Sequence, residues 1–62
     1  MCDINVFVVE KGIEEMVLEN VDLIEEVAQG MRLVNIFGEE RTIKAKMVRF
    51  DNSHKRMVFQ PV

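Results

Sequence analysis

Apolar side chains recur at every second position through most of this chain, and this period constrains the fold more than any other feature of the sequence. The first such run covers residues 2–9 (CDINVFVV) and is rich in β-branched residues. A period of two sends successive side chains to opposite faces of a β-strand. Turn signals follow at intervals of about 8–12 residues, so the pattern predicts a small all-β barrel or sandwich of five or six short strands.

The expected strands leave little of the chain outside the sheet. Lys11-Gly12 predicts a tight hairpin turn in which glycine supplies a positive φ, and residues 13–18 form the return strand. Residues 19–30 have spacing that also fits one or two helical turns, but their length and flanks favour a bent strand. Further strands are expected over 31–37, 41–50 and 55–60, with turns at 38–40 and 51–54.

The expected core consists of the apolar residues on the inner faces of these strands, and adaptable methionine side chains suit such a core. The predicted core residues are Ile4, Val6, Val8, Met16, Leu18, Leu33, Ile43, Ala45, Met47, Met57 and Phe59.

The chain of 62 residues has room for one domain, which we expect to span residues 1–62. A domain of this size buries only about 60% of the surface of its unfolded chain, so a metal or a partner subunit is a common source of extra stability. The single cysteine excludes an internal disulfide. No apolar run approaches the roughly 20 residues of a membrane span, and the acidic start is unlike a signal peptide. We therefore expect a cytoplasmic protein.

The formal net charge of −3 hides a strong asymmetry between the two halves of the chain. Residues 1–30 carry eight acids and one base, whereas residues 31–62 carry seven bases and three acids. Ion pairs between strands of opposite charge would explain this distribution. A basic surface that binds a partner is the alternative.

The sequence offers little for catalysis, and we expect no enzymatic activity. Ser53 directly precedes His54, a spacing that rarely aligns a nucleophile with its base, and no third residue that would orient the histidine is evident. The three Glu-Glu pairs do not converge, because adjacent residues of a strand point to opposite faces. A glycine-rich phosphate loop is also missing.

Cys2 is the strongest candidate for a metal ligand. Removal of Met1 would leave its α-amine and thiol on one residue, and together they form a five-membered chelate. Two such chelates related by a two-fold axis provide two nitrogens and two sulfurs, a set that suits Ni(II) or Cu(II) in square-planar geometry. The alternative is that Cys2 is a small apolar residue at the start of a strand.

His54 is the second candidate ligand, because its imidazole could bind the same metal or another one. The alternative is a turn histidine in solvent, as its Asp-Asn-Ser context indicates.

The start MCDINVFVV and the motif RLVNIFGE at residues 32–39, together with the length of the chain, resemble the CooT family of small nickel-binding proteins. The resemblance implies an SH3-like β-barrel, a homodimer and Ni(II) held between two subunits through Cys2. It also implies storage of nickel or its delivery to a nickel enzyme such as carbon monoxide dehydrogenase, or to the maturation proteins of that enzyme.

The same family resembles a group described as predicted RNA-binding proteins, which gives an alternative function. In that alternative, Lys44 and Lys46 share an outward strand face that binds phosphates. Arginines would flank this face, and a phenylalanine would stack on bases. The residues expected to contribute are Arg41, Arg49, Arg56, Phe37 and Phe50.

Overall fold

The structure is a computed structural model that describes residues 3–62, and these residues form six strands of a single sheet without a helix. The all-β prediction is therefore confirmed, within the expected number of strands. In residues 3–62 there is no helix long and apolar enough to cross a membrane. The strands are β1 (Ile4–Glu10), β2 (Ile13–Val27), β3 (Gly30–Asn35), β4 (Glu40–Ile43), β5 (Ala45–Asp51) and β6 (Arg56–Pro61).

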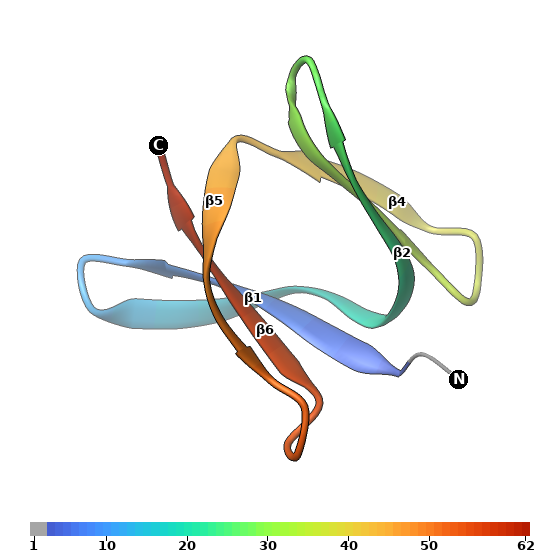
Figure 1. Cartoon of the computed structure of the whole chain (residues 1–62), viewed down its shortest axis with the longest axis horizontal. Helices are drawn as coiled ribbons and strands as arrows, with labels where there is room; N and C mark the ends of the chain where they lie inside the picture. The colour runs from blue at the N-terminus through green and yellow to red at the C-terminus, as the bar shows by residue number, and fades with distance from the viewer. Residues whose placement is uncertain (1–2) are drawn as a thin grey trace.

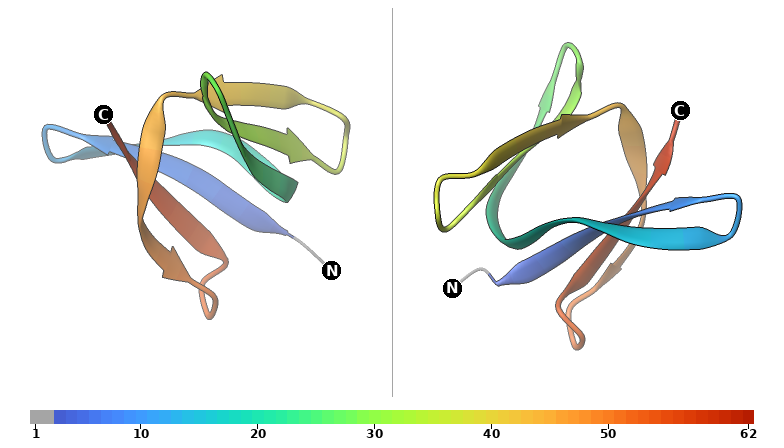
Figure 2. Two further views of the ribbon diagram at one scale, coloured as in Figure 1. Left: turned by 45° about the horizontal axis from the view of Figure 1, so that its top comes forward. Right: turned by 180° about the vertical axis from the view of Figure 1, so that it is seen from behind.

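The strands follow the order β4-β3-β2-β1-β6-β5, and every neighbouring pair is antiparallel except β1 and β6, which are parallel. The long strand β2 makes the sheet curl. Its first part pairs with β1 and its second part with β3, and Val21 lies opposite a residue on each side. Asn20 has a φ of 53° at this bend. The sheet therefore wraps into the barrel-like shape seen in Figures 1 and 2.

Residues 19–27 continue β2, so the bent strand is confirmed over the helical alternative. The single strand expected over residues 41–50 is wrong, because the chain breaks at Lys44 into β4 and β5. β4 pairs with β3 and β5 pairs with β6, at the two opposite edges of the sheet. A straight strand cannot reach both edges, so the chain bends where it passes from one to the other.

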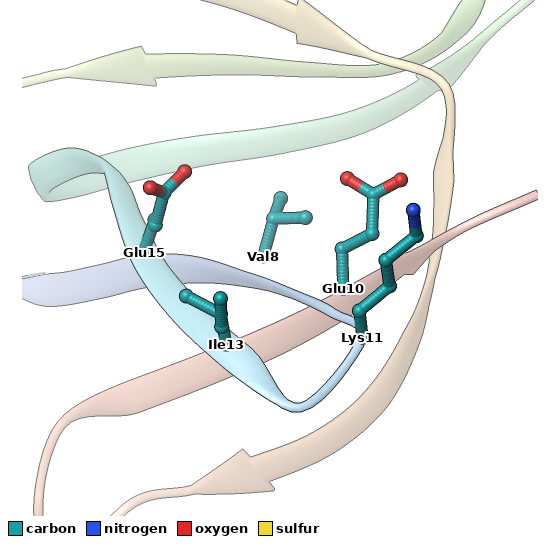
Figure 3. A pocket seen from close by; sticks show the side chains of 5 residues that line it. All are labelled: Val8, Glu10, Lys11, Ile13 and Glu15. Carbon is teal, nitrogen blue, oxygen red and sulfur yellow. The ribbon is translucent and has the colours of Figure 1, made fainter.

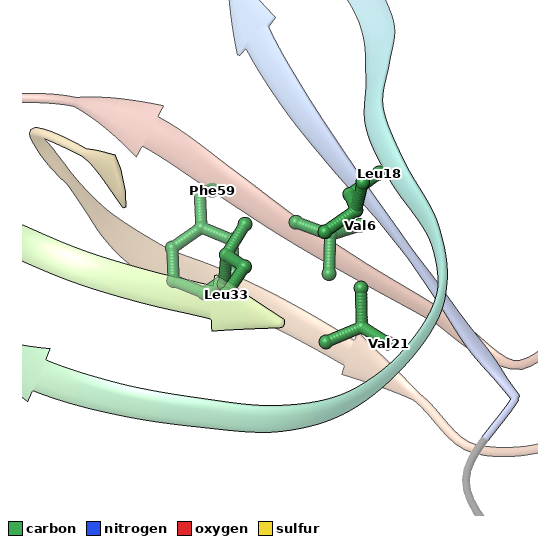
Figure 4. Packing of buried hydrophobic residues seen from close by; sticks show 5 residues of the cluster. All are labelled: Val6, Leu18, Val21, Leu33 and Phe59. Atoms are coloured by element: carbon green, nitrogen blue, oxygen red, sulfur yellow. The ribbon is translucent and has the colours of Figure 1, made fainter. Parts of the chain in front are cut away.

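The core lies inside the curled sheet and is built from β1, β2, β3 and β6. Figure 4 shows its side chains pointing toward one another. The cluster consists of Val6, Leu18, Val21, Leu33 and Phe59. All of these except Val21 were predicted from the sequence. The predicted residues Val8, Ile43, Ala45 and Met57 pack against the cluster and are half-buried, and Ile4 is also half-buried.

Two predicted core methionines are wrong. Met16 is 52% exposed and Met47 is 53% exposed. Met16 lies opposite Phe7, and a register shift at this point means that Met16 and Leu18 face opposite sides of the sheet despite their spacing of two. Met47 lies opposite the buried Phe59, but β5 is an edge strand, so no further strand covers it.

Charged side chains pair between the two halves of the sequence, as the first explanation of the charge asymmetry predicted. Arg32 on β3 contacts Glu25 on β2, with 2.7 Å between Nη1 and Oε1, and it also contacts Glu40. Arg56 on β6 contacts Glu14 on β2 and stacks over the ring of Phe7 at 4.1 Å from its centroid. These pairs account for part of the basic charge that a nucleic-acid surface would need.

Candidate functional site

The start of β1 meets three other segments at one end of the sheet. The ladder places Ile4 opposite Val21, and Val21 in turn opposite Asn35, so the start of β1 and the end of β3 lie in one row. The parallel pairing sets Asn5 opposite Arg56 at the start of β6. We name this region the N-terminal end and define it as residues 3–5, 19–21, 35–39 and 51–56.

Hydrogen bonds tie these four segments together. The Asn5 N–H donates to the Lys55 carbonyl at 2.9 Å, and the Asn5 side-chain oxygen accepts from the Asn20 N–H at 3.2 Å. The Asn20 carbonyl accepts from the Ile36 N–H at 3.0 Å. The turn that carries His54 is therefore fixed beside the start of β1, which Cys2 precedes by two residues in the sequence.

His54 lies on the surface, with its side chain 73% exposed, in the turn between β5 and β6. Its Nδ1 is 2.9 Å from Oδ2 of Asp51. Hydrogen bonds from Ser53 and then from His54 lower the pKa of the Asp51 carboxyl to about 2. Asp51 is therefore ionised near neutral pH and only accepts, so Nδ1 of the neutral ring carries the proton and Nε2 keeps its lone pair. Histidine ligands of metals commonly have this carboxylate partner.

Asp51 is the partner of His54 that sequence reasoning missed, because no residue that would orient His54 was evident. Aspartate followed by serine and histidine within three positions is the signal, since a short acidic side chain readily accepts from its own turn. The carboxylate accepts from the Ser53 hydroxyl at 2.8 Å and from the His54 N–H at 3.2 Å.

This cluster of aspartate, serine and histidine does not have the geometry of a catalytic triad. Ser53 Oγ lies 3.2 Å from Nδ1 of His54, the same nitrogen that faces Asp51. In a triad the carboxylate and the nucleophile use different ring nitrogens. The serine hydroxyl also donates to the carboxylate rather than to the histidine. The arrangement therefore orients an imidazole and does not activate a nucleophile.

The structure describes only one of the two predicted metal ligands, His54. Cys2 lies outside the described residues. Within residues 3–62, no group of three or more histidine, cysteine, aspartate or glutamate side chains could hold a metal ion by itself. His54 and its carboxylate partner therefore do not form a metal site by themselves within these residues.

The basic and aromatic residues of the alternative function do not form one face. Lys44 and Lys46 are exposed beside the break between β4 and β5. Phe37 follows β3, beyond the other end of β4 from Lys44. Arg56 is engaged by Glu14 and Phe7, and Arg49 lies 3.8 Å from Asp51.

A shallow pocket at the hairpin between β1 and β2 lies away from these groups (Figure 3). Glu10 and Glu15 stand on either side of Val8, so their carboxylates do not converge on one point. The pocket is also lined by Lys11 and Ile13, at the opposite end of β1 from the N-terminal end. It contributes nothing to a site with His54.

Two comparisons with known proteins indicate the same family. A crystal structure assigned as CooT from Carboxydothermus hydrogenoformans is similar to this chain with a TM-score of 0.93 and 34% sequence identity, and the match covers 98% of each chain. A search of curated proteins gave no match. The family described as CO dehydrogenase accessory protein CooT matches residues 1–60. The chain therefore belongs to the CooT family of CO dehydrogenase accessory proteins.

Proposed function

We propose that this chain is a nickel-binding accessory protein in which the Cys2 residues of two copies hold one Ni(II) ion for storage or delivery to a nickel enzyme such as carbon monoxide dehydrogenase. The nickel is cargo, so the protein needs no catalytic residues of its own. The proposal also includes its location in the cytoplasm.

The observation that carries the proposal is the His54 turn beside the start of β1. Lys55 is hydrogen-bonded to Asn5, and Nδ1 of His54 faces the Asp51 carboxylate, which leaves Nε2 as the ring nitrogen that could bind a metal. An imidazole nitrogen is a suitable ligand for Ni(II), as are a thiolate and an amine. A site shared by two chains suits a carrier, because separation of the chains removes half of the ligands.

The test is a titration of the reduced protein with Ni(II), followed by the absorbance of the thiolate-to-nickel charge transfer. Intact mass establishes whether Met1 is present, because a retained Met1 turns the Cys2 amine into an amide and weakens the chelate. We expect one nickel per two chains in protein that begins at Cys2. The Cys2→Ser variant should lose this binding while its circular dichroism stays unchanged. Unchanged nickel binding in Cys2→Ser would overturn the proposal.

His54→Ala separates the contribution of the histidine from that of Cys2. We expect weaker nickel binding in this variant with the same folded signal, because the substituted side chain is exposed and supports no core packing. Nickel affinity equal to that of the unmodified chain would remove His54 from the ligand set and leave Cys2 as the candidate.

RNA binding remains the alternative, with weaker support, because Arg56 is engaged by neighbouring side chains and Phe37 is separated from Lys44. The variant Lys44→Glu/Lys46→Glu tests it and serves as a control for the nickel titration. We expect full nickel binding in this variant. RNA binding by the unmodified chain that falls with salt and disappears in the variant would favour the alternative.

A further inference from the structure

The two edge strands of the sheet, β4 and β5, are protected to different degrees. Within residues 3–62 the outer edge of each strand pairs with no other strand. Such an edge offers unpaired N–H and C=O groups to any extended chain, so edge strands are commonly very short or carry a charged side chain that points inward. β4 has both of these features, and β5 has neither.

The edge of β4 is blocked by its length and by Arg41. The strand has only four residues. Arg41 lies opposite Leu33, which is buried in the core, so the arginine belongs to the inward face of the sheet. A strand that paired with this edge would bring its own inward side chains against that charge. β4 is therefore a poor template for a further strand.

The edge strand β5 has seven residues, and its inward side chains are apolar. Met47 lies opposite the buried Phe59, and Phe50 lies opposite Met57, which packs against the core. Val48 between them has no partner in the register, so it is the extra residue of a bulge. Met47 and Phe50 are nevertheless 53% and 46% exposed, because the sheet ends at β5 and β4 diverges from it (Figures 1 and 2). A strand added to this edge would cover both side chains with its own inward residues.

The outward face of β5 is basic. Lys46 and Arg49 face outward, because each is adjacent to one of the inward residues Met47 and Phe50. Within residues 3–62, Lys46 makes no ion pair, and Arg49 has only a contact of 3.8 Å with Asp51. Side chains directly opposite each other on paired strands lie about 5 Å apart, and opposite charges stabilise such pairs. The outward residues of an added strand should therefore be acidic.

Two other occupants fit this edge less well. If the β5 edges of two copies paired about a two-fold axis, their basic outward faces would meet, and like charges on opposite strands are destabilising. An RNA chain would bind Lys46 and Arg49 through its phosphates, but it has no peptide groups that continue the ladder of the sheet. Only a polypeptide strand uses the backbone edge, the apolar inward face and the basic outward face together.

We propose that the edge of β5 binds an extended segment of another protein in which apolar and acidic residues alternate. The segment continues the sheet through main-chain hydrogen bonds. Its apolar side chains cover Met47 and Phe50, and its carboxylates lie beside Lys46 and Arg49. This surface involves neither Cys2 nor a metal, so the inference is independent of the proposed function.

The probe for this edge is a fluorescent peptide of alternating valine and glutamate, as long as β5, and fluorescence anisotropy measures its affinity for the full chain. Met47→Lys gives β5 an inward charge of the kind that β4 has. The matched control is Met16→Lys, because Met16 is 52% exposed, much like Met47, but lies on β2. We expect Met47→Lys to weaken binding about tenfold. Met16→Lys and Cys2→Ser should bind the peptide as the unmodified chain does, and circular dichroism should stay unchanged in all three variants.

Two further measurements separate strand pairing from attraction between charges. A peptide of the same sequence with a fully N-methylated backbone keeps its carboxylates but has no N–H groups, and we expect it not to bind. Lys46→Glu should weaken binding of the unmethylated peptide, because it places an acid opposite the acids of the added strand. Lys11→Glu is the control, since Lys11 is exposed in the hairpin between β1 and β2.

Three outcomes would overturn the inference. They are no binding of the valine–glutamate peptide at millimolar concentration, equal binding by Met47→Lys and Met16→Lys, and equal binding of the N-methylated and unmethylated peptides. A uridylate oligonucleotide that binds the unmodified chain but not Lys46→Glu, while the peptide binds neither, would assign this face to RNA instead.

Discussion

The two ends of β3 are held in place by different kinds of contact. At its start, Gly30 packs its backbone directly against residues 43–44, where the chain passes from β4 to β5. We name this region the closing end. At its finish, Asn35 uses its side chain to hold a turn that leaves two apolar residues in water. Backbone contact closes the barrel at the first end, whereas side-chain hydrogen bonds shape the surface at the second.

This contrast indicates where substitutions will affect stability and where they will affect binding. Changes at the closing end should destabilise the fold without a separate effect on nickel binding or on dimerisation. Changes at the N-terminal end should have smaller effects on the free energy of unfolding and larger effects on nickel binding and self-association. The predictions below test that division, beginning with the largest effect.

Gly30→Ala should be the most destabilising substitution. A Cβ atom at this position would lie 2.2 Å from the Ile43 carbonyl oxygen, and the φ of +137° is unfavourable for any L side chain. We expect a loss of about 3 kcal/mol in the free energy of unfolding, measured by urea denaturation. The control is Gly12→Ala, because Gly12 also has a positive φ of 79° but nothing lies within 4 Å. It should cost about 1 kcal/mol. Equal effects would show that steric contact at the closing end is unimportant.

Asn35→Ala should come next, since it leaves the Phe37 and Glu39 N–H groups without their side-chain acceptor. We expect a loss of about 2 kcal/mol by urea denaturation. Asn52→Ala is the control, because Asn52 is exposed in the other turn and should change stability by less than about 0.5 kcal/mol. A variant Asn35→Ala as stable as the unmodified chain would contradict the role of this side chain.

The smallest effect concerns Asp51 and depends on pH. Its pKa is about 2 in the folded chain and about 3.9 in an unfolded chain. The carboxylate therefore stabilises the fold above about pH 4, and this contribution disappears as the pH falls toward about 2. Urea denaturation of the unmodified chain and Asp51→Asn should differ at pH 6 and converge near pH 2. Ser53→Ala should reduce the same difference, because the hydroxyl is the largest cause of the lowered pKa. A constant difference across this range would exclude the ionised carboxylate as its source.

The local pattern of the sequence was enough to predict the strand-rich fold and several turns. β-branched residues at a period of two indicate strands whatever their partners, and Lys11-Gly12 forms the expected turn with φ values of 55° and 79°. The same pattern identified Val6, Leu18, Leu33 and Phe59 as core residues, and all four are buried.

The core predictions for two methionines were wrong in strands where a register shift interrupts the alternation of inward and outward side chains. The register shift in β2 moves Met16 to the face opposite Leu18, and a similar shift follows Met47 in β5. A one-residue bulge reverses the faces of all positions beyond it, and its location depends on the partner strand. The sequence of one strand does not contain that information.

For the candidate site, the sequence by itself predicted the types of ligand in the proposal: a thiol and, after removal of Met1, an amine at Cys2, and an imidazole at His54. Only the tertiary structure decided that the His54 turn lies beside the start of β1, because the two segments are about fifty residues apart and meet through the parallel pairing of β1 with β6. The exposure of Ile36 and Phe37 was likewise decided in three dimensions. Their apolar character favours burial, but the hydrogen bonds of Asn35 hold the turn at the surface of the sheet.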